Sequence, residues 1–199
     1  MKLLKTLTLS LIVATSLLSS DVFANNYTNG DSVNVMVEAS LFFEAYKNKQ
    51  YEMWTIEKGL NVINAKPDFM PKLEIYKKID KVISEVYADS NSTDELKTAL
   101  ADTAIYLYNK AIEFDKEDAG YFMLKKAYTL DQWKHVQPEV AIAAYEEGFA
   151  ADTSFTSEKI YYADQLGTLY KNNSNDDNDY QIKALEMYSK LSDLEPENG

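Results

Sequence analysis

The sequence contains a single histidine, His135, and neither cysteine nor arginine. A Ser–His–Asp triad would have to use His135, because no other imidazole is present to act as the general base. Thiol nucleophiles, disulfides and zinc–thiolate sites need cysteine, and bidentate clamps for phosphate favour arginine. His135 stands in the polar segment DQWKHVQPE, within residues 129–139, which we predict to be a solvent-facing loop. We therefore expect a protein that is not an enzyme and carries no cofactor.

The acidic run NDDND at residues 175–179 is the second candidate for chemistry. Calcium takes about six or more oxygen ligands, which in the common loop come from alternating positions with a glycine for the turn and a distal glutamate. The run has no glycine, and the first glutamate after it is Glu186. We interpret the run as a solvated loop before a helix and expect no metal site, although the sequence alone leaves cation binding open.

The charge balance excludes one class of partner. The chain has 20 basic side chains, all of them lysine, and 32 acidic ones, which gives a net charge of −12. A nucleic-acid backbone would be repelled by this charge, so we expect no nucleic-acid partner. The hydrophobic share of 46% is too high for a disordered tail. The composition indicates a folded, acidic domain.

The first 24 residues have the three parts of a secretory signal peptide. Lys2 and Lys5 form a positive start, residues 7–18 are an apolar run softened only by Thr, Ser and Ala, and Val-Phe-Ala at 22–24 is a cleavage site of the small-x-small type. The apolar run is too short to span a bilayer, and no later run approaches that length, so we expect no membrane span. A lipoprotein anchor needs a cysteine. The sequence therefore predicts an exported protein that is not a lipoprotein and is periplasmic, or alternatively secreted.

The remainder of the chain has the apolar period of α-helices. Residues 25–32 form a polar lead-in, and residues 33–199 form one domain. In its first helix Val35, Ala39, Phe42 and Tyr46 fall on one face. Later stripes are Met53, Ile56, Leu60 and Ile63, and then Leu73, Tyr76, Ile79, Ile83 and Val86. Alternating β-branched runs, which would indicate strands, are scarce. The sequence predicts an all-α domain.

A local pattern recurs in the second half of the chain. A small residue is followed four positions later by an aromatic one, and seven positions later by a second small or apolar residue. The small residues let two helices approach closely, and the aromatic one fills the space beside them. We expect the following residues to pack the repeats: Ala104, Tyr108, Ala111, Leu124, Tyr128, Ala141, Tyr145, Gly148, Leu166, Gly167, Tyr170, Ala184, Tyr188, Leu191 and Pro196.

This pattern resembles the tetratricopeptide repeat, a helix–turn–helix unit of about 34 residues. The resemblance implies a right-handed α–α superhelix of about four hairpins. Their expected ranges are 33–67, 72–118, 119–152 and 157–196. The segment FFEAYKNKQYEMWTIEKGLNVINAKPDF, followed by a helix rich in Lys, Ile and Tyr, further resembles exported proteins of this type from Gram-negative cell envelopes. That likeness implies an envelope location and a protein-binding role, so we expect a scaffold or adaptor with a protein partner.

In such repeats the first helix of each hairpin lines a groove for the partner. The candidate groove residues by spacing are Lys125, Lys126, Asp164, Thr168 and Lys171. The alternative function is a small-ligand or glycan-binding accessory protein, since the chain has 15 tyrosines. That alternative predicts a closed, aromatic-lined pocket rather than an open groove.

The closing segment KALEMYSKLSDLEPENG reads as the second helix of a hairpin. A repeat stack needs a polar cap on its last apolar face, and nothing after Pro196 can supply one. We therefore expect either a homodimer through this C-terminal face, a partner on it, or a longer gene product.

Overall fold

The computed structural model describes residues 34–151, 159–176 and 178–194, and these residues are helical with no strand among them. The all-α prediction is confirmed for this part of the chain. The signal peptide predicted for residues 1–24, the lead-in at 25–32 and Pro196 lie outside it. The α-helices are α2 (Val35–Lys47), α3 (Met53–Ala65), α4 (Ile75–Ala88), α5 (Asp94–Phe114), α6 (Ala119–Tyr128), α7 (Pro138–Ala151), α8 (Ile160–Asn173) and α9 (Tyr180–Leu194).

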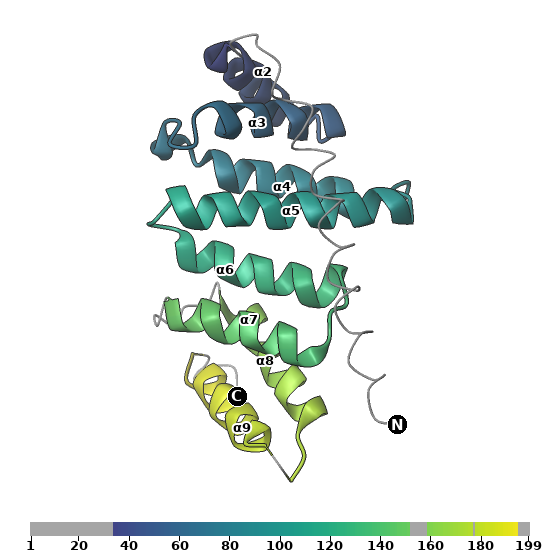
Figure 1. The fold of residues 1–199 in the computed structure, drawn as a ribbon, viewed down its shortest axis with the longest axis vertical. Coiled ribbons are helices and arrows are strands. Elements are labelled where there is room, and N and C mark those ends of the chain that lie inside the picture. The colour runs from purple at the N-terminus through teal and green to yellow at the C-terminus, as the bar shows by residue number, and fades with distance from the viewer. Residues whose placement is uncertain (1–33, 152–158, 177, 195–199) are drawn as a thin grey trace, which may run out of the picture. The chain divides into compact units, whose positions relative to one another are not determined.

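Helices that follow one another in the chain pack against one another, from α2 on α3 through to α8 on α9 (Figure 1). The helix pairs α2–α3, α4–α5, α6–α7 and α8–α9 stand within the four ranges in which the sequence predicts hairpins. Contacts are therefore mostly between neighbours in the sequence, as expected when short loops join antiparallel helices.

The buried side chains form two hydrophobic clusters that meet at α6. The first runs from Ala39 on α2 to Phe122 on α6, and the second from Leu124 on α6 to Met187 on α9. Phe122 and Leu124 are both fully buried although they are two residues apart, because they lie on different sides of the helix. Helix α6 thus joins the two clusters.

The repeat residues occupy the interior of this packing. Ala104, Tyr108, Tyr145 and Leu166 are all buried, whereas Tyr188 is half-buried. The others divide in the same way: Ala111, Leu124, Ala141, Gly148, Gly167, Tyr170 and Ala184 are buried, and Tyr128 and Leu191 are half-buried. Spacing of small and aromatic residues therefore locates helix contacts in this chain.

Glycines mark the closest helix approaches. A Cβ atom on Gly148 of α7 would lie 2.8 Å from Leu124 Cδ2 and 3.1 Å from the Leu124 backbone nitrogen. On Gly59 of α3 a Cβ would lie 2.5 Å from Ile79 Cγ1 of α4. The contacts at 2.8 and 2.5 Å are shorter than Cβ atoms adopt in proteins, so these helix pairs pack at a separation that requires glycine.

Two residues assigned to apolar stripes face solvent instead. Met53 is the first residue of α3 and is exposed. Leu73 precedes α4, in a short 3₁₀ turn η2 (Pro71–Leu73), and is also exposed. Glu74 then adopts a left-handed backbone with φ 49°, so the helix begins only at Ile75. The prediction that Leu73 belongs to the buried stripe was wrong for this reason.

The segment after α6 is the largest departure from the sequence prediction. Residues 129–139 were expected to form a loop, but the chain continues from α6 into a π-helical turn, η3 (Thr129–Trp133). The Lys134 N–H donates to the Thr129 carbonyl at 3.0 Å, five residues back. His135 then takes a positive φ of 48° and is exposed, as the sequence predicted. The π turn places Trp133 beside α4, which sets up the site described next.

Candidate functional site

A groove of about 410 Å³ opens between helices that come from two neighbouring hairpins. Four elements contribute to it: α4, α5, α6 and η3. Its lining residues are Ser84, Tyr87, Ala88, Lys97, Lys125, Tyr128 and Trp133. The volume falls within the range of about 300–1,000 Å³ that is usual for pockets that bind small molecules.

One wall of the groove is aromatic. The rings of Tyr87 and Trp133 are stacked, with centroids 3.8 Å apart and planes at 6° to each other. Tyr128 stands edge-on to Trp133 at 6.4 Å, and Tyr161 of α8 stands edge-on to Tyr128 at 5.6 Å. The wall therefore continues from α4 across η3 and α6 to α8, a path that only the π turn makes continuous.

Two ammonium groups face the groove. Lys97 lies over the Tyr87 ring, with Nζ 5.8 Å from the ring centroid. Within the described part of the chain, Lys97 contacts no carboxylate at ion-pair distance. Lys125, in contrast, lies 3.0 Å from Asp80, and their side chains are 16% and 5% exposed. The groove thus holds one lysine with an internal counterion and one without.

Asp80 is the centre of a buried polar cluster beneath the groove. Besides pairing with the Lys125 ammonium, Asp80 accepts hydrogen bonds from the hydroxyl of Tyr108 at 2.5 Å and from that of Tyr121 at 3.4 Å. Burial, and then the charge of Asp80, raises the pKa of both tyrosines well above its ordinary value, so both hydroxyls stay protonated and donate. Asp80 therefore fixes Lys125 in place at the base of the groove.

The predicted groove residues separate onto different surfaces. Lys125 lines the groove, but Lys126 lines a smaller cavity of about 120 Å³, between α5, α6 and α7. Consecutive helix positions point about 100° apart, so the two lysines cannot share a face. Asp164, Thr168 and Lys171 are exposed on α8, outside the groove lining.

The structure also brings together residues that the sequence reading did not single out. Tyr87, Lys97 and Trp133 line the groove together, although they are far apart in the chain. Ser84, Tyr87 and Ala88 do share a helix face by spacing. That spacing alone does not distinguish a groove from a solvated surface. Trp133 lies in the segment that the sequence predicts to be a loop, so no feature of the sequence indicated that Trp133 would stack on Tyr87.

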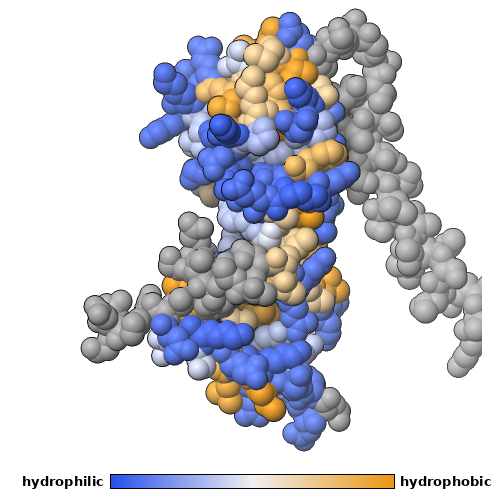
Figure 2. Space-filling model, turned by 90° about the vertical axis from the view of Figure 1, so that its left-hand side faces the viewer, coloured by the Kyte–Doolittle hydropathy of each residue, from blue (hydrophilic) through white to orange (hydrophobic). Residues whose placement is uncertain are grey.

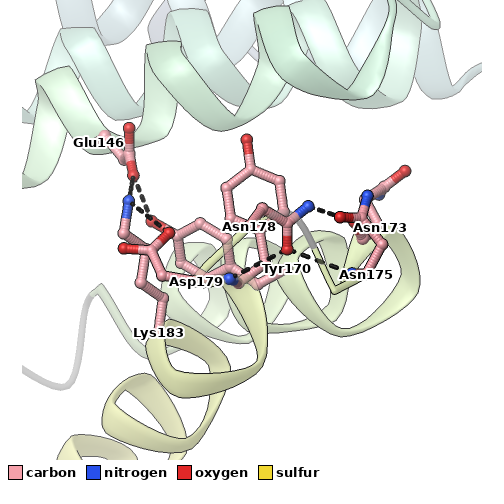
Figure 3. A network of polar contacts seen from close by, with 8 residues as sticks. Glu146, Tyr170, Asn173, Asn175, Asn178, Asp179 and Lys183 are labelled. Carbon is pink, nitrogen blue, oxygen red and sulfur yellow. Dashed lines mark hydrogen bonds and ion pairs between the residues drawn. The ribbon is translucent and has the colours of Figure 1, made fainter.

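The acidic segment at 175–179 contributes to a network between α7, α8 and α9 (Figure 3). Glu146 accepts from the Tyr170 hydroxyl at 2.7 Å and from Lys183 Nζ at 3.0 Å. The side-chain oxygen of Asn178 accepts from the N–H of Tyr180, the first residue of α9, at 3.3 Å. This network joins the three helices.

The expected solvated loop at 175–179 is described in part, because Asp177 lies outside the described residues. Asp176 and Asp179 are exposed, and Asp179 pairs with Lys183 at 3.5 Å. No acidic or histidine side chains among residues 34–151, 159–176 and 178–194 gather closely enough to hold a metal ion.

Exposed apolar side chains occur on the first and last described helices. The surface seen in Figure 2 is largely hydrophilic, with apolar residues gathered near its top and bottom. Met36 and Val37 on α2 are 56% and 50% exposed, and Ile182 and Leu185 on α9 are 62% and 66% exposed. Dimerisation through the C-terminal face stays a prediction.

Comparisons of this chain with protein-family models, with curated proteins and with solved structures found no match. None of the helices described here combines the length and the apolar character needed to cross a lipid bilayer. What the groove can bind therefore follows from its own residues: an aromatic wall for an apolar group, and two lysines for an anion.

Proposed function

We propose that this protein is a non-enzymatic adaptor that holds a segment of a partner protein in the groove between α4, α6 and η3. The observation that carries the proposal is the groove itself, with its stacked Tyr87–Trp133 pair and its two lysines. Aromatic side chains with a polar tip are enriched where proteins bind one another, because one end is apolar and the other hydrated.

The extent of the aromatic wall favours a peptide segment over a compact ligand. The wall runs from Tyr87 through Trp133 and Tyr128 to Tyr161, and it crosses four elements. An extended chain can contact such a row through successive side chains, whereas a small molecule would use only part of it.

The glycan-binding alternative is less well supported. Sugars stack on bare aromatic faces, but Tyr87 and Trp133 each cover one face of the other, and Lys97 also lies over the Tyr87 ring.

The repeat family and the cellular location are part of the same proposal. The small–aromatic spacing, the buried repeat residues and the sequential helix pairs support a tetratricopeptide-like stack with a right-handed superhelix. The N-terminal residue pattern supports export to the periplasm of a bacterial envelope, where the adaptor would meet its partner.

The experiment is a selection of short peptides from a displayed random library on the purified chain. Selected peptides are then tested against a Ser84→Trp variant, whose indole fills the groove. A Ser40→Trp variant on the exposed surface of α2 is the matched control. We expect Ser84→Trp to abolish binding and Ser40→Trp to leave it unchanged. Peptides that bind both variants equally well would overturn the groove as the binding site.

A further inference from the structure

We infer that the groove recognises an acidic side chain of the partner segment, and that Lys97 is the residue that selects it. This inference rests on the proposed function, because it names the chemistry that the same groove would take. It follows from how the two groove lysines differ in their surroundings.

The positive charge of Lys125 is already used within the protein. Its ammonium group pairs with Asp80 at 3.0 Å, and that carboxylate is further held by the Tyr108 hydroxyl at 2.5 Å. A ligand carboxylate near Lys125 would therefore face Asp80 as well. Lys125 contributes a positioned hydrogen-bond donor to the groove and little net charge.

The positive charge of Lys97 has no such partner in the described part of the chain. Asp94 and Glu95 precede it in the first turn of α5, and among the described residues neither forms an ion pair with it. The first turn of a helix is also where the backbone dipole disfavours a cation. A lysine at this position therefore adds little to folding, whereas a carboxylate bound in the groove would find an available ammonium group there.

The ring beneath Lys97 completes the recognition element. Tyr87 holds the ammonium over its face at 5.8 Å, and the Tyr87–Trp133 stack offers an apolar edge next to it. A partner segment that suits this arrangement has an aspartate or glutamate beside an apolar or aromatic residue. With a net charge of −12 the chain as a whole repels an acidic segment, so the attraction within the groove has to come from Lys97.

The test uses peptides selected on the groove, each synthesised with an amidated C-terminus so that only side-chain carboxylates are compared. For each peptide a second version replaces aspartate with asparagine and glutamate with glutamine. Binding of both versions is measured to the wild-type chain, to Lys97→Gln and to Lys126→Gln. Lys126 is the matched control, because it lies in a different cavity.

We expect the amide versions to bind the wild-type chain about tenfold more weakly, as for the loss of one charge-assisted hydrogen bond. Lys97→Gln is expected to weaken the acidic peptides about tenfold and to leave the amide versions unchanged. Lys126→Gln is expected to leave every affinity unchanged. Added salt should weaken the acidic peptides and not the amide ones.

The inference fails if acidic and amide versions bind equally, or if Lys97→Gln and Lys126→Gln have the same effect. In that case the proposed function still holds, provided that Ser84→Trp abolishes the binding. If no peptide binding is sensitive to Ser84→Trp, or if only oligosaccharides bind in the groove, both the inference and the proposed function are overturned.

Discussion

The ammonium group of Lys125 on α6 lies 3.0 Å from the carboxylate of Asp80 on α4, and this ion pair connects the buried interior with the groove. Asp80 is 4% exposed and also accepts a hydrogen bond from the buried hydroxyl of Tyr108. The same contact therefore holds two hairpins together and fixes the groove's most buried cation.

Replacing Asp80 with alanine should destabilise the fold by about 3 kcal/mol, because it leaves a largely buried ammonium group and the Tyr108 hydroxyl without their acceptor. The free energy of unfolding from urea titration measures the loss. Asp80→Leu combined with Lys125→Met should recover most of it, since no uncompensated charge is then buried. Lys126→Met is the control and should change stability by less than about 0.5 kcal/mol. Equal effects of Asp80→Ala and Lys126→Met would contradict this role of the ion pair.

Gly148→Ala should destabilise the chain by about 1–2 kcal/mol, although alanine forms helix better than glycine by about 1 kcal/mol. The added Cβ would lie 3.1 Å from the backbone nitrogen of Leu124, which cannot move without shifting α6. Gly167→Ala is the matched comparison, because its Cβ would meet only the half-buried ring of Tyr188, at 3.0 Å. That ring can turn aside, so the second substitution should be nearly neutral. Thermal unfolding of both variants tests this expectation. A larger loss of stability for Gly167→Ala than for Gly148→Ala would contradict the packing account.

Alkaline pH should unfold the protein through its buried tyrosines. Burial, and then the charge of Asp131, raises the pKa of Tyr145, and burial raises the pKa of the more exposed Tyr161 to about 12. In the unfolded chain tyrosine ionises near pH 10, so above about pH 10 the unfolded state binds fewer protons than the folded one. The stability that these groups contribute is fully present below about pH 10 and declines as pH rises toward 12 and beyond.

Urea midpoints measured across this pH range, with tyrosinate followed by its ultraviolet absorption, test the expectation. Tyr145→Phe should make the decline shallower while changing stability little at neutral pH, since the Tyr145 hydroxyl reaches Asp131 only at 3.5 Å. A midpoint that does not change with pH, or a steeper decline in Tyr145→Phe, would contradict it.

The stack of Tyr87 on Trp133 should contribute a coupling energy of about 1 kcal/mol. A double-mutant cycle with Tyr87→Ala and Trp133→Ala, read from the free energy of unfolding, isolates it. Because the rings lie 3.8 Å apart and nearly parallel, the losses of the single variants should sum to more than the loss of the double variant. Additive losses would show that the rings do not support one another.

Helix positions and many helix contacts were predictable from the sequence because they depend on local spacing. Ala104 and Tyr108 stand four residues apart, which places them on one helix face, and both are fully buried. Thr93 directly precedes α5 and is a residue type that caps helices, and its hydroxyl accepts from the Leu96 N–H at 3.3 Å.

The groove was not predictable, because it depends on contacts between distant segments. A π turn has no simple residue signature, so nothing in TLDQWKH indicated that Trp133 would reach Tyr87. Which of Lys125 and Lys126 faces the groove depends on the rotation of α6 against α4, which is set by tertiary packing. The spacing of the two lysines leaves that rotation undetermined.

The most direct test of the central claim uses the two tryptophans of the chain, Trp54 and Trp133. Each gives one indole N–H signal in a two-dimensional NMR spectrum, and a Trp54→Phe variant assigns them. Trp133 lines the groove, whereas Trp54 is exposed on α3. Titration with a selected acidic peptide should shift the Trp133 signal to saturation and leave the Trp54 signal in place. A peptide that binds without moving the Trp133 signal would contradict the groove as the site where this protein holds its partner.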